Sequence, residues 1–346
     1  MNLIIGGGVG EHGRNCFFVE TKKENFLFDC GIMPGVSTPF PRLNGVQIQS
    51  AKWLFISHSH IDHTGAYDWL CEQGFDGCVV MTKETSRQVL FSPKNVRLIN
   101  ELIPALKEYF LSEDLIVTWG KSGQCAGSVW YKICVDDKSI LFSGDYIEDT
   151  LVYRCDYIRN ANADIAVLDS AYGKIIHSPT EYRKVLVNTV KDCIERNKIV
   201  LFPVPKYGRG FELLALFHKS FPHVPVKLDA HLHGELTRVK KYEEWIKPDF
   251  ITSIKEINFS DSDESGIIFT SDPQLNTAKG HKIAEEIIIR NGAIILTGHE
   301  DIGSYSEALR LSGRAVSLRY SVHMNDSERS NLERANSFKD VISYHH

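Results

Sequence analysis

The sequence predicts an α/β fold of about two domains. The chain has 346 residues, and a domain typically has about 100 to 200. Short apolar segments typical of strands, such as Lys52–Ser57 and Ile199–Pro203, alternate with segments of helical spacing, such as Ala66–Gln73 and Glu181–Arg196. The hydrophobic fraction of 43% and the charged fraction of 24% are ordinary globular values. They exclude a disordered chain, a collagen and a small disulfide-held scaffold.

The composition also predicts a cytoplasmic protein. No apolar run approaches the roughly 20 residues that span a bilayer, and residues 1–10 lack the features of a signal peptide. The eight cysteines are scattered without a CxxC pair, so we expect reduced, mostly buried thiols. The net charge of −5 argues against broad adhesion to nucleic acid, although a bound metal would dominate the field at a local phosphate site.

A run of glycines comes first along the chain. Residues 6–13, GGGVGEHG, contain the pattern GxGxxG, and Asp29 follows as in a dinucleotide-binding fingerprint. That fingerprint requires a helix directly after the glycines. Here Cys16–Glu20 and Phe26–Asp29 are apolar and β-prone, with a polar turn between them. We therefore predict a hairpin and no dinucleotide site.

The strongest motif follows the predicted buried strand Lys52–Ser57. It reads HSHIDHTG, residues 58–65, and places three imidazoles and a carboxylate within six residues at a strand end. These groups are suited to zinc, manganese or iron. A solvated polar loop is the usual explanation for a lone histidine, but not for HxHxDH after an apolar strand. The motif therefore predicts a metal site with the ligands His58, His60, Asp62 and His63.

HSHIDHTG resembles the signature of the metallo-β-lactamase superfamily, which implies an αβ/βα sandwich with metals at one sheet edge. The resemblance assigns His58 and His60 to one metal, and Asp62 and His63 to a second. It also gives roles to two strand-end acids. Asp29 matches an acid that orients the metal loop, and Asp145, after the strand Ser139–Ser143, matches the carboxylate that bridges the metals.

One position departs from this pattern. The superfamily has a third histidine in a GHxxGS-like stretch, whereas Gly123–Ser128 has Gln124 at that point. A glutamine carbonyl is a neutral, weaker oxygen ligand, and zinc sites favour nitrogen, thiolate or carboxylate. Cys125 beside it would offer a thiolate if the loop turned, but a buried apolar role is the usual one. We expect the first metal site to be empty, weak or selective for a harder metal.

The second half of the chain carries four further motifs, VLDSAYG (167–173), GRGFELL (208–214), YSVH (320–323) and VISYH (341–345). In this order they resemble the motifs of the β-CASP nucleases. The N-terminal glycine run also resembles the opening of ribonuclease J-like proteins. The resemblance implies that His323 is a general acid held by Asp169, and that His345 binds metal. His345 lies one residue from the end of the sequence, where a frayed terminus would be a poor ligand.

The resemblance also implies the organisation of the chain. Residues 1–172 would form the first part of a metallo-β-lactamase-like core, residues 173–315 an inserted β-CASP-like α/β domain, and residues 316–346 the return to the core, without an extra C-terminal domain. We expect zinc in two sites, one of them weak or empty, with manganese as the alternative. Lys206, Arg209 and Ser321 are the expected substrate-binding residues.

The function implied is a metal-dependent hydrolase, a ribonuclease that cleaves phosphodiester bonds of single-stranded RNA. Asp62 would orient the attacking hydroxide while His323 protonates the leaving oxygen. We expect no membrane partner and leave open a homodimer. Two alternatives also stay open: a hydrolase of a small ester or nucleotide, and a non-catalytic scaffold that binds nucleic acid. Gln124 favours the scaffold, whereas the other intact ligands oppose it.

Overall fold

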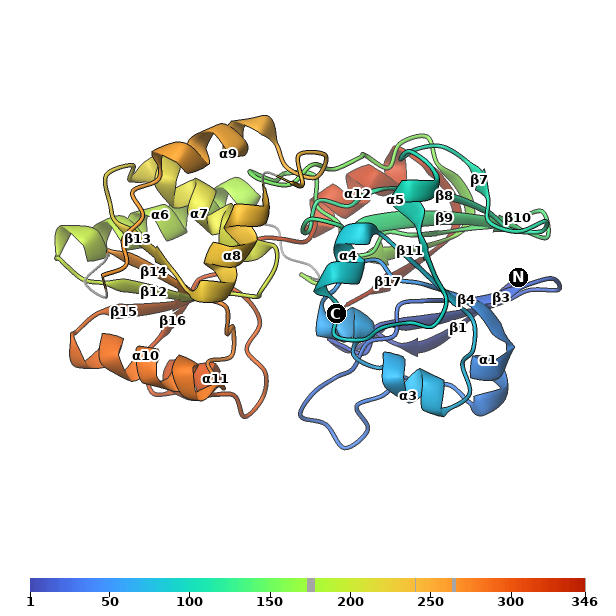
Figure 1. Cartoon of the computed structure of the whole chain (residues 1–346), viewed down its shortest axis with the longest axis horizontal. Coiled ribbons are helices and arrows are strands. Elements are labelled where there is room, and N and C mark those ends of the chain that lie inside the picture. Colours follow the sequence, from blue (N-terminus) through green and yellow to red (C-terminus); the bar gives the residue numbers. More distant parts are fainter. Residues whose placement is uncertain (173–177, 240, 263–265, 346) are drawn as a thin grey trace. The chain divides into compact units, whose positions relative to one another are not determined.

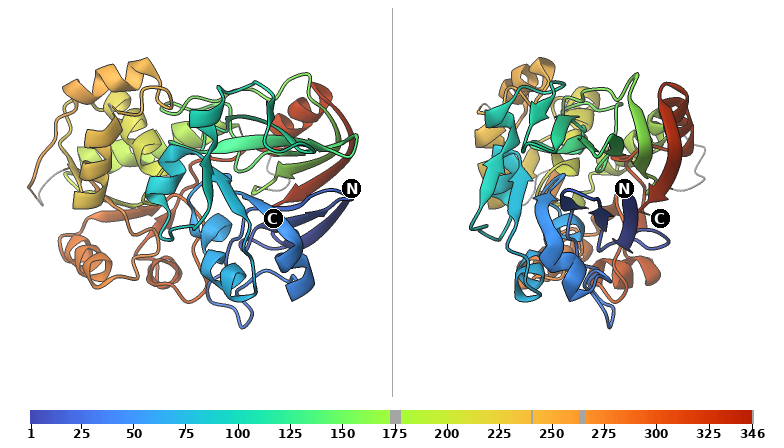
Figure 2. Two further views of the ribbon diagram at one scale, coloured as in Figure 1. Left: turned by 45° about the vertical axis from the view of Figure 1, so that its right-hand side comes forward. Right: turned by 90° about the vertical axis from the view of Figure 1, so that its right-hand side faces the viewer.

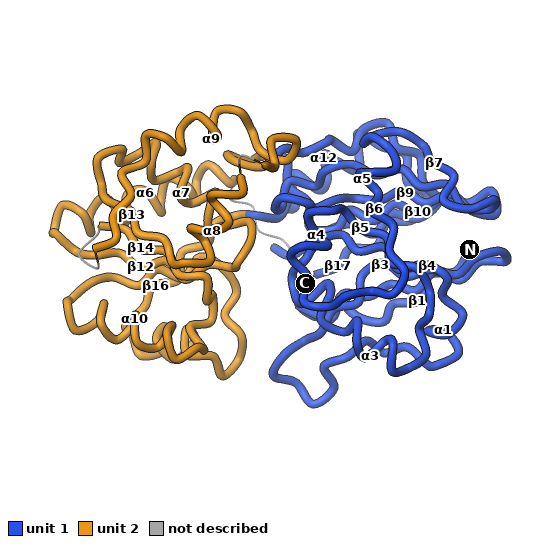
Figure 3. The backbone as a smooth tube through the Cα atoms, in the orientation of Figure 1, with its two compact units in different colours: residues 1–148, 154–176, 322–346 blue, residues 149–153, 177–321 orange. Residues whose placement is uncertain are grey.

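The computed structural model describes residues 1–172, 178–239, 241–262 and 266–345 (Figure 1). The chain divides into two compact units (Figure 3). The first comprises residues 1–148, 154–176 and 322–346, and the second comprises residues 149–153 and 177–321. The expected boundary at 172/173 falls beside residues 173–177, which lie outside the described residues. Within the described ranges, no helix is long and apolar enough to cross a membrane.

The first unit contains two six-stranded sheets, ordered β1-β2-β3-β4-β5-β6 and β17-β11-β10-β9-β8-β7. The strands of the first sheet are β1 (Asn2–Gly7), β2 (Cys16–Glu20), β3 (Asn25–Phe28), β4 (Ala51–Phe55), β5 (Cys78–Met81) and β6 (Val96–Leu98). Those of the second are β7 (Tyr109–Phe110), β8 (Ile116–Lys121), β9 (Val129–Val135), β10 (Lys138–Phe142), β11 (Asn162–Asp169) and β17 (Ser337–Tyr344). The predicted hairpin is confirmed, because β2 and β3 pair antiparallel with Phe17 opposite Phe28.

The two sheets pack face to face, as the alternation of side chains along β4 shows. Phe55 points between the sheets, where its ring centroid lies 5.4 Å from that of Tyr131 on β9. Leu54, its neighbour, packs on the outer side with Ile48 and Leu70 of two helices. The helices of this unit are α1 (Gly45–Ser50), α2 (Ile61–Thr64), α3 (Tyr67–Glu72), α4 (Lys83–Gln88), α5 (Ile99–Leu102) and α12 (Asp326–Arg334).

The outer face of the second sheet is also covered by a helix. Leu332 of α12 belongs to the same buried cluster as Leu168 of β11. The first unit is therefore an αβ/βα sandwich (Figure 2). Its aromatic core lies between the sheets. The α/β class predicted from the sequence is confirmed.

The second unit is built on a parallel sheet ordered β13-β14-β12-β15-β16. Leu201 and Phe202 of β12 point to opposite faces, where they pack with α10 and α7 respectively. The strands are β12 (Val200–Pro203), β13 (Val226–Leu228), β14 (Ile267–Thr270), β15 (Ala293–Leu296) and β16 (Val316–Ser317). The helices are α6 (Pro179–Glu195), α7 (Arg209–Ser220), α8 (Ala230–Val239), α9 (Pro248–Ser253), a 3-10 turn (Ile254–Glu256), α10 (Ala278–Ile289) and α11 (Tyr305–Leu311).

The second unit extends beyond residue 315, where the sequence analysis ended the insert. β16 pairs with β15 of this unit, and residues up to 321 belong to it. Residues 149–153 also belong to it, because the buried carboxylate of Glu212 accepts hydrogen bonds from the backbone of Leu151 and Val152, both at 2.8 Å. Neither feature has a signal in the local sequence.

Candidate metal centre

The candidate site lies at the carboxyl ends of parallel strands in the first unit. β3 runs parallel to β4, and β11 runs parallel to both β10 and β17. Parallel strands end at the same edge of their sheet, so the residues that follow them come together. The residues at these ends are Asp29 after β3, the loop 57–63 after β4, Asp145 after β10, Asp169 as the last residue of β11, and His345 after β17.

The metal loop, residues 57–63, is hydrogen-bonded to the segment that follows β3. Asp29 accepts the Ser57 backbone N–H through Oδ1 and the Ser57 hydroxyl through Oδ2, both at 2.7 Å. The two segments approach so closely that a Cβ on Gly31 would lie 1.6 Å from the carbonyl oxygen of Asp62. Only glycine fits there. Asp29 therefore holds the start of the loop through Ser57, and its role in orienting the metal loop stays a prediction.

Three ligands form a group around His63. Its Nδ1 lies 2.7 Å from Asp29 Oδ2, which directs Nε2 towards Asp145 Oδ1 at 3.2 Å. Asp62 and His345 complete the group, with His345 Nε2 3.1 Å from Asp62 Oδ2. The ligand atoms of Asp62, His63 and His345 all lie within 4.8 Å of one another, so one ion can contact all three.

His58 and His60 form a second group with Asp145. His58 Nδ1 lies 3.0 Å from the Ser57 hydroxyl, which leaves Nε2 facing Asp145 Oδ2 at 3.4 Å. This buried Nε2 makes no hydrogen bond within the part of the chain that the structure describes, as expected of an atom that binds metal. Burial and the neighbouring His58 lower the pKa of His60 to about 3, so its imidazole is neutral and able to coordinate.

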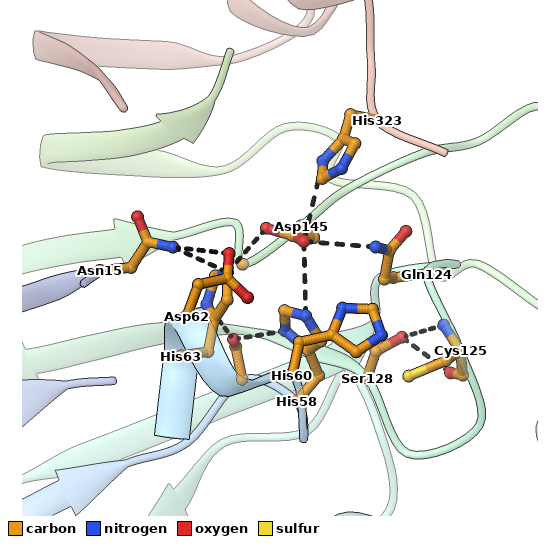
Figure 4. A network of polar contacts seen from close by, with 12 residues as sticks. Asn15, His58, His60, Asp62, His63, Gln124, Cys125, Ser128, Asp145 and His323 are labelled. Atoms are coloured by element: carbon orange, nitrogen blue, oxygen red, sulfur yellow. Dashed lines mark hydrogen bonds and ion pairs between the residues drawn. The ribbon is translucent and has the colours of Figure 1, made fainter. Parts of the chain in front are cut away.

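Asp145 lies between these two groups (Figure 4). Its Oδ1 faces His63 and His345, at 3.2 and 3.4 Å, whereas its Oδ2 faces His58 and Gln124, at 3.4 and 3.3 Å. Burial alone would raise the pKa of this carboxyl, but the facing imidazoles, His63 first, hold it well below its usual range. One ionised carboxylate thus presents one oxygen to each ligand group, which is the geometry of a bridging ligand.

His323 lies on the Asp145 Oδ2 side of the site, held by Asp169. Its Nδ1 is 2.8 Å from Asp169 Oδ2 and 3.8 Å from Asp145 Oδ2. Asp169 is fully buried and also accepts the Tyr146 backbone N–H at 3.1 Å. Burial opposes ionisation of Asp169, but the facing His323 imidazole lowers the pKa of its carboxyl below the usual value. The pair therefore fixes the orientation of the His323 ring.

His345 is not frayed, although it is the last residue described. β17 pairs with β11 as far as Tyr344, opposite Asp169. The backbone N–H of His345 donates to the Gly8 carbonyl, and the ring of His12 stacks on its ring at 4.3 Å. The side chain is 2% exposed. Long-range pairing therefore holds His345 in place although it lies near the end of the chain, while His346 lies outside the described residues.

The donor set of this centre fits divalent transition metals. It consists of imidazoles and carboxylates, which are the ligands of zinc and manganese. One ion would be held by His58, His60 and Asp145, and a second by Asp62, His63, His345 and Asp145. This is the division that the resemblance implied for His58 and His60 and for Asp62 and His63, and it stays a prediction.

Comparison with known proteins agrees with this arrangement. Residues 9–88, which contain the metal loop, match the model of the metallo-β-lactamase superfamily. This chain contains a metallo-β-lactamase domain. A solved structure of a protein of unknown function from Enterococcus faecalis shares the fold with a TM-score of 0.63 at 13% identity, covering 99% of this chain and 93% of that one.

Proteins similar to this chain carry nuclease names. It is 26% identical to "Probable RNase MJ4" of Methanocaldococcus jannaschii over 66% of this chain and 59% of that one. It is 22% identical to an "RNase J-like protein" of the same organism over 93% and 86% of the two chains. It is 26% identical to cleavage and polyadenylation specificity factor 73 of Drosophila melanogaster over 63% of this chain but only 36% of that one. The chain thus spans about half or less of the length of some of these relatives. The predicted resemblance to β-CASP nucleases is confirmed.

Sequence reasoning missed some residues of this candidate metal centre. Asn15 is fully buried, and its amide Nδ2 lies 3.3 Å from Asp62 Oδ2 and 3.0 Å from His63 Nε2. The hydroxyl of Tyr344 lies 3.4 Å from Asp145 Oδ1. Asn15 closes the N-terminal run that resembles ribonuclease J-like proteins, which was an available signal. No sequence signal pointed to Tyr344, because its position near Asp145 depends on the packing of β17.

The remaining predicted residues lie elsewhere. Cys125 is 2% exposed, burial and the charge of Asp145 raise the pKa of its thiol to about 12, and it joins no group of metal ligands among the described residues. Lys206, Arg209 and Ser321 belong to the second unit. Lys206 is exposed and Ser321 is buried, and their role in binding substrate stays a prediction.

Proposed function

We propose that the protein is a metal-dependent ribonuclease of the β-CASP type that cleaves phosphodiester bonds in single-stranded RNA. The observation that carries the proposal is the position of Asp145, with one carboxylate oxygen towards each ligand group and His323 beside it. The nuclease names of the relatives support the choice of substrate. We also propose zinc as the resident metal, with manganese as the alternative, and a cytoplasmic location.

When two divalent metals are bound, the chemistry they supply is activation of a water molecule and stabilisation of the charge on phosphorus. The residues of the chain hold and orient these groups. Asp145 keeps the two ligand groups in one fixed relation, because both of its oxygens are engaged. Asp62, beside His63 and His345, is the carboxylate placed to orient the attacking water. Asn15 fixes the Asp62 side chain through its amide.

His323 is the proposed general acid. Its Nδ1 is engaged by the Asp169 carboxylate, so a proton passes to the leaving oxygen from Nε2. Asp169 stabilises the charged imidazolium and holds the ring in place, and Tyr172 lies edge-on to the same ring at 5.2 Å. Lys206 and Arg209 of the second unit are the proposed contacts to the RNA backbone, since cations that neutralise phosphates supply affinity without base recognition.

A cleavage assay tests this proposal. Labelled single-stranded RNA and DNA of the same sequence are incubated with zinc, manganese or magnesium. We expect cleavage of RNA that is lost with chelator, with Asp62→Asn and with His323→Gln. His281→Gln is the matched control, because His281 is an exposed histidine of the second unit that stacks on Tyr305. Cleavage that persists in both site variants, or turnover of a small ester in place of RNA, would overturn the proposal.

A further inference from the structure

Gln124 makes the two ligand groups chemically unequal. Its side-chain Nε2 donates to Asp145 Oδ2 at 3.3 Å, while its Oε1 is buried without a hydrogen-bond partner in the described part of the chain. The residue is 4% exposed. An unpaired acceptor at such a position requires an explanation, because buried polar atoms are nearly always paired. Here the orphaned oxygen lies beside a candidate metal site that has one ligand fewer than its superfamily pattern.

The group formed by His58, His60 and Asp145 has little negative charge and few donor atoms for a metal ion. His58 and His60 supply two imidazoles, and Asp145 supplies one oxygen of a shared carboxylate. The Gln124 amide hydrogen is directed at this same oxygen, so it competes with a metal ion for the lone pairs of Oδ2. The glutamine itself can add only a neutral carbonyl oxygen, and only if its amide rotates.

The group formed by Asp62, His63 and His345 has more donor atoms. Asp62 adds a carboxylate that the His58–His60 group lacks, and the imidazoles of His63 and His345 approach the other oxygen of Asp145. Asp29 fixes the His63 ring through Nδ1 and leaves Nε2 for metal. An ion of charge +2 gains more from this site by simple electrostatics and by ligand orientation.

We propose that the two sites fill in order, and that Gln124 sets the difference between them. The Asp62–His63–His345 site holds its ion tightly, whereas the His58–His60 site exchanges its ion with the surroundings. Changing even an outer partner of a metal ligand typically costs about 10- to 100-fold in affinity, so a missing imidazole ligand gives a difference of at least about 100-fold. The inference rests on the metal-binding part of the proposed function and not on RNA as the substrate.

Metal titration tests the inference without any assay of activity. Metal-free protein is dialysed against solutions that buffer free zinc over a wide range, and bound zinc is measured per chain. Titration with cobalt(II) gives the same steps from its visible absorption bands. We expect the natural protein to bind one ion and then a second at a concentration at least about 100-fold higher. Gln124→His should bring the two steps together, and Gln124→Glu should narrow the gap.

Gln73→His is the control, because it adds an imidazole at an exposed position and should leave both steps unchanged. Thermal unfolding of each variant shows that it is folded. Two equally tight ions in the natural protein would overturn the inference, as would a Gln124→His variant with an unchanged weak step. Two unequal steps in a protein that cleaves no RNA would support the inference and defeat the proposed function, so the two failures are distinguishable.

Discussion

Replacing Asp29 by asparagine should weaken metal binding without disturbing the backbone. Asp29 has φ 54°, in the left-handed region that asparagine also adopts readily, so the substitution adds little strain. The asparagine oxygen must keep facing the Ser57 backbone N–H, because that donor cannot reverse its role. The new amide nitrogen then takes the place of Oδ2 and donates to His63 Nδ1.

This change forces the wrong tautomer on His63. A neutral imidazole that accepts at Nδ1 carries its proton on Nε2, the nitrogen that faces Asp145 and would bind metal. Partners that orient a metal-binding histidine are typically worth about 10- to 100-fold in affinity. At about 1.4 kcal/mol for each factor of ten, Asp29→Asn should cost about 1.4 to 2.8 kcal/mol of binding free energy at the tight site.

Competition with a chelating dye measures this affinity. Asp164→Asn is the control, since it removes the same charge from the first unit at a position where the carboxylate contacts Lys138 and Lys339. We expect normal affinity in the control and a weakened tight step in Asp29→Asn, with similar thermal unfolding of the metal-free forms. An unchanged tight step in Asp29→Asn would refute the role assigned to the His63 tautomer.

Two further predictions concern stability and pH. Glu212→Gln should lower the free energy of unfolding in urea by about 2 to 4 kcal/mol. The reason is that the backbone N–H groups of Leu151 and Val152 lose a carboxylate acceptor. A loss of stability below about 1 kcal/mol would contradict this prediction. Although burial alone lowers the pKa values of His63 and His345, Asp145 raises both well above the usual value. Metal must then displace about two protons, so affinity should rise with pH until those raised pKa values are passed. Calorimetry in buffers of different ionisation enthalpy measures the release, and heats independent of the buffer would count against it.

Much of the site could be predicted because its candidate ligands lie directly after the ends of strands. An apolar strand followed by HxHxDH or by Asp145 is a local pattern, and parallel strands bring such ends together without further information. The resemblance implied that His58 and His63 serve different metals, and the structure brings these two imidazoles to different oxygens of Asp145.

The rest depends on contacts between distant segments. The burial of His345 comes from the pairing of β17 with β11, which no terminal sequence reveals. Asn15 reaches Asp62 across 47 positions of sequence, and only packing decides that contact. The same holds for Gln124. The sequence shows that a glutamine stands at this position, but it does not show that the amide nitrogen faces Asp145 or that Oε1 is left without a hydrogen-bond partner among the described residues.

Anomalous diffraction from crystals grown with excess zinc tests the central claim most directly. The claim is that Asp145 bridges two metal ions at the carboxyl ends of the strands. We expect two anomalous peaks roughly 3.5–4 Å apart, one beside His58 and His60 and the other beside Asp62, His63 and His345. Absence of any peak within ligand distance of Asp145, or a single peak even in excess zinc, would contradict the account.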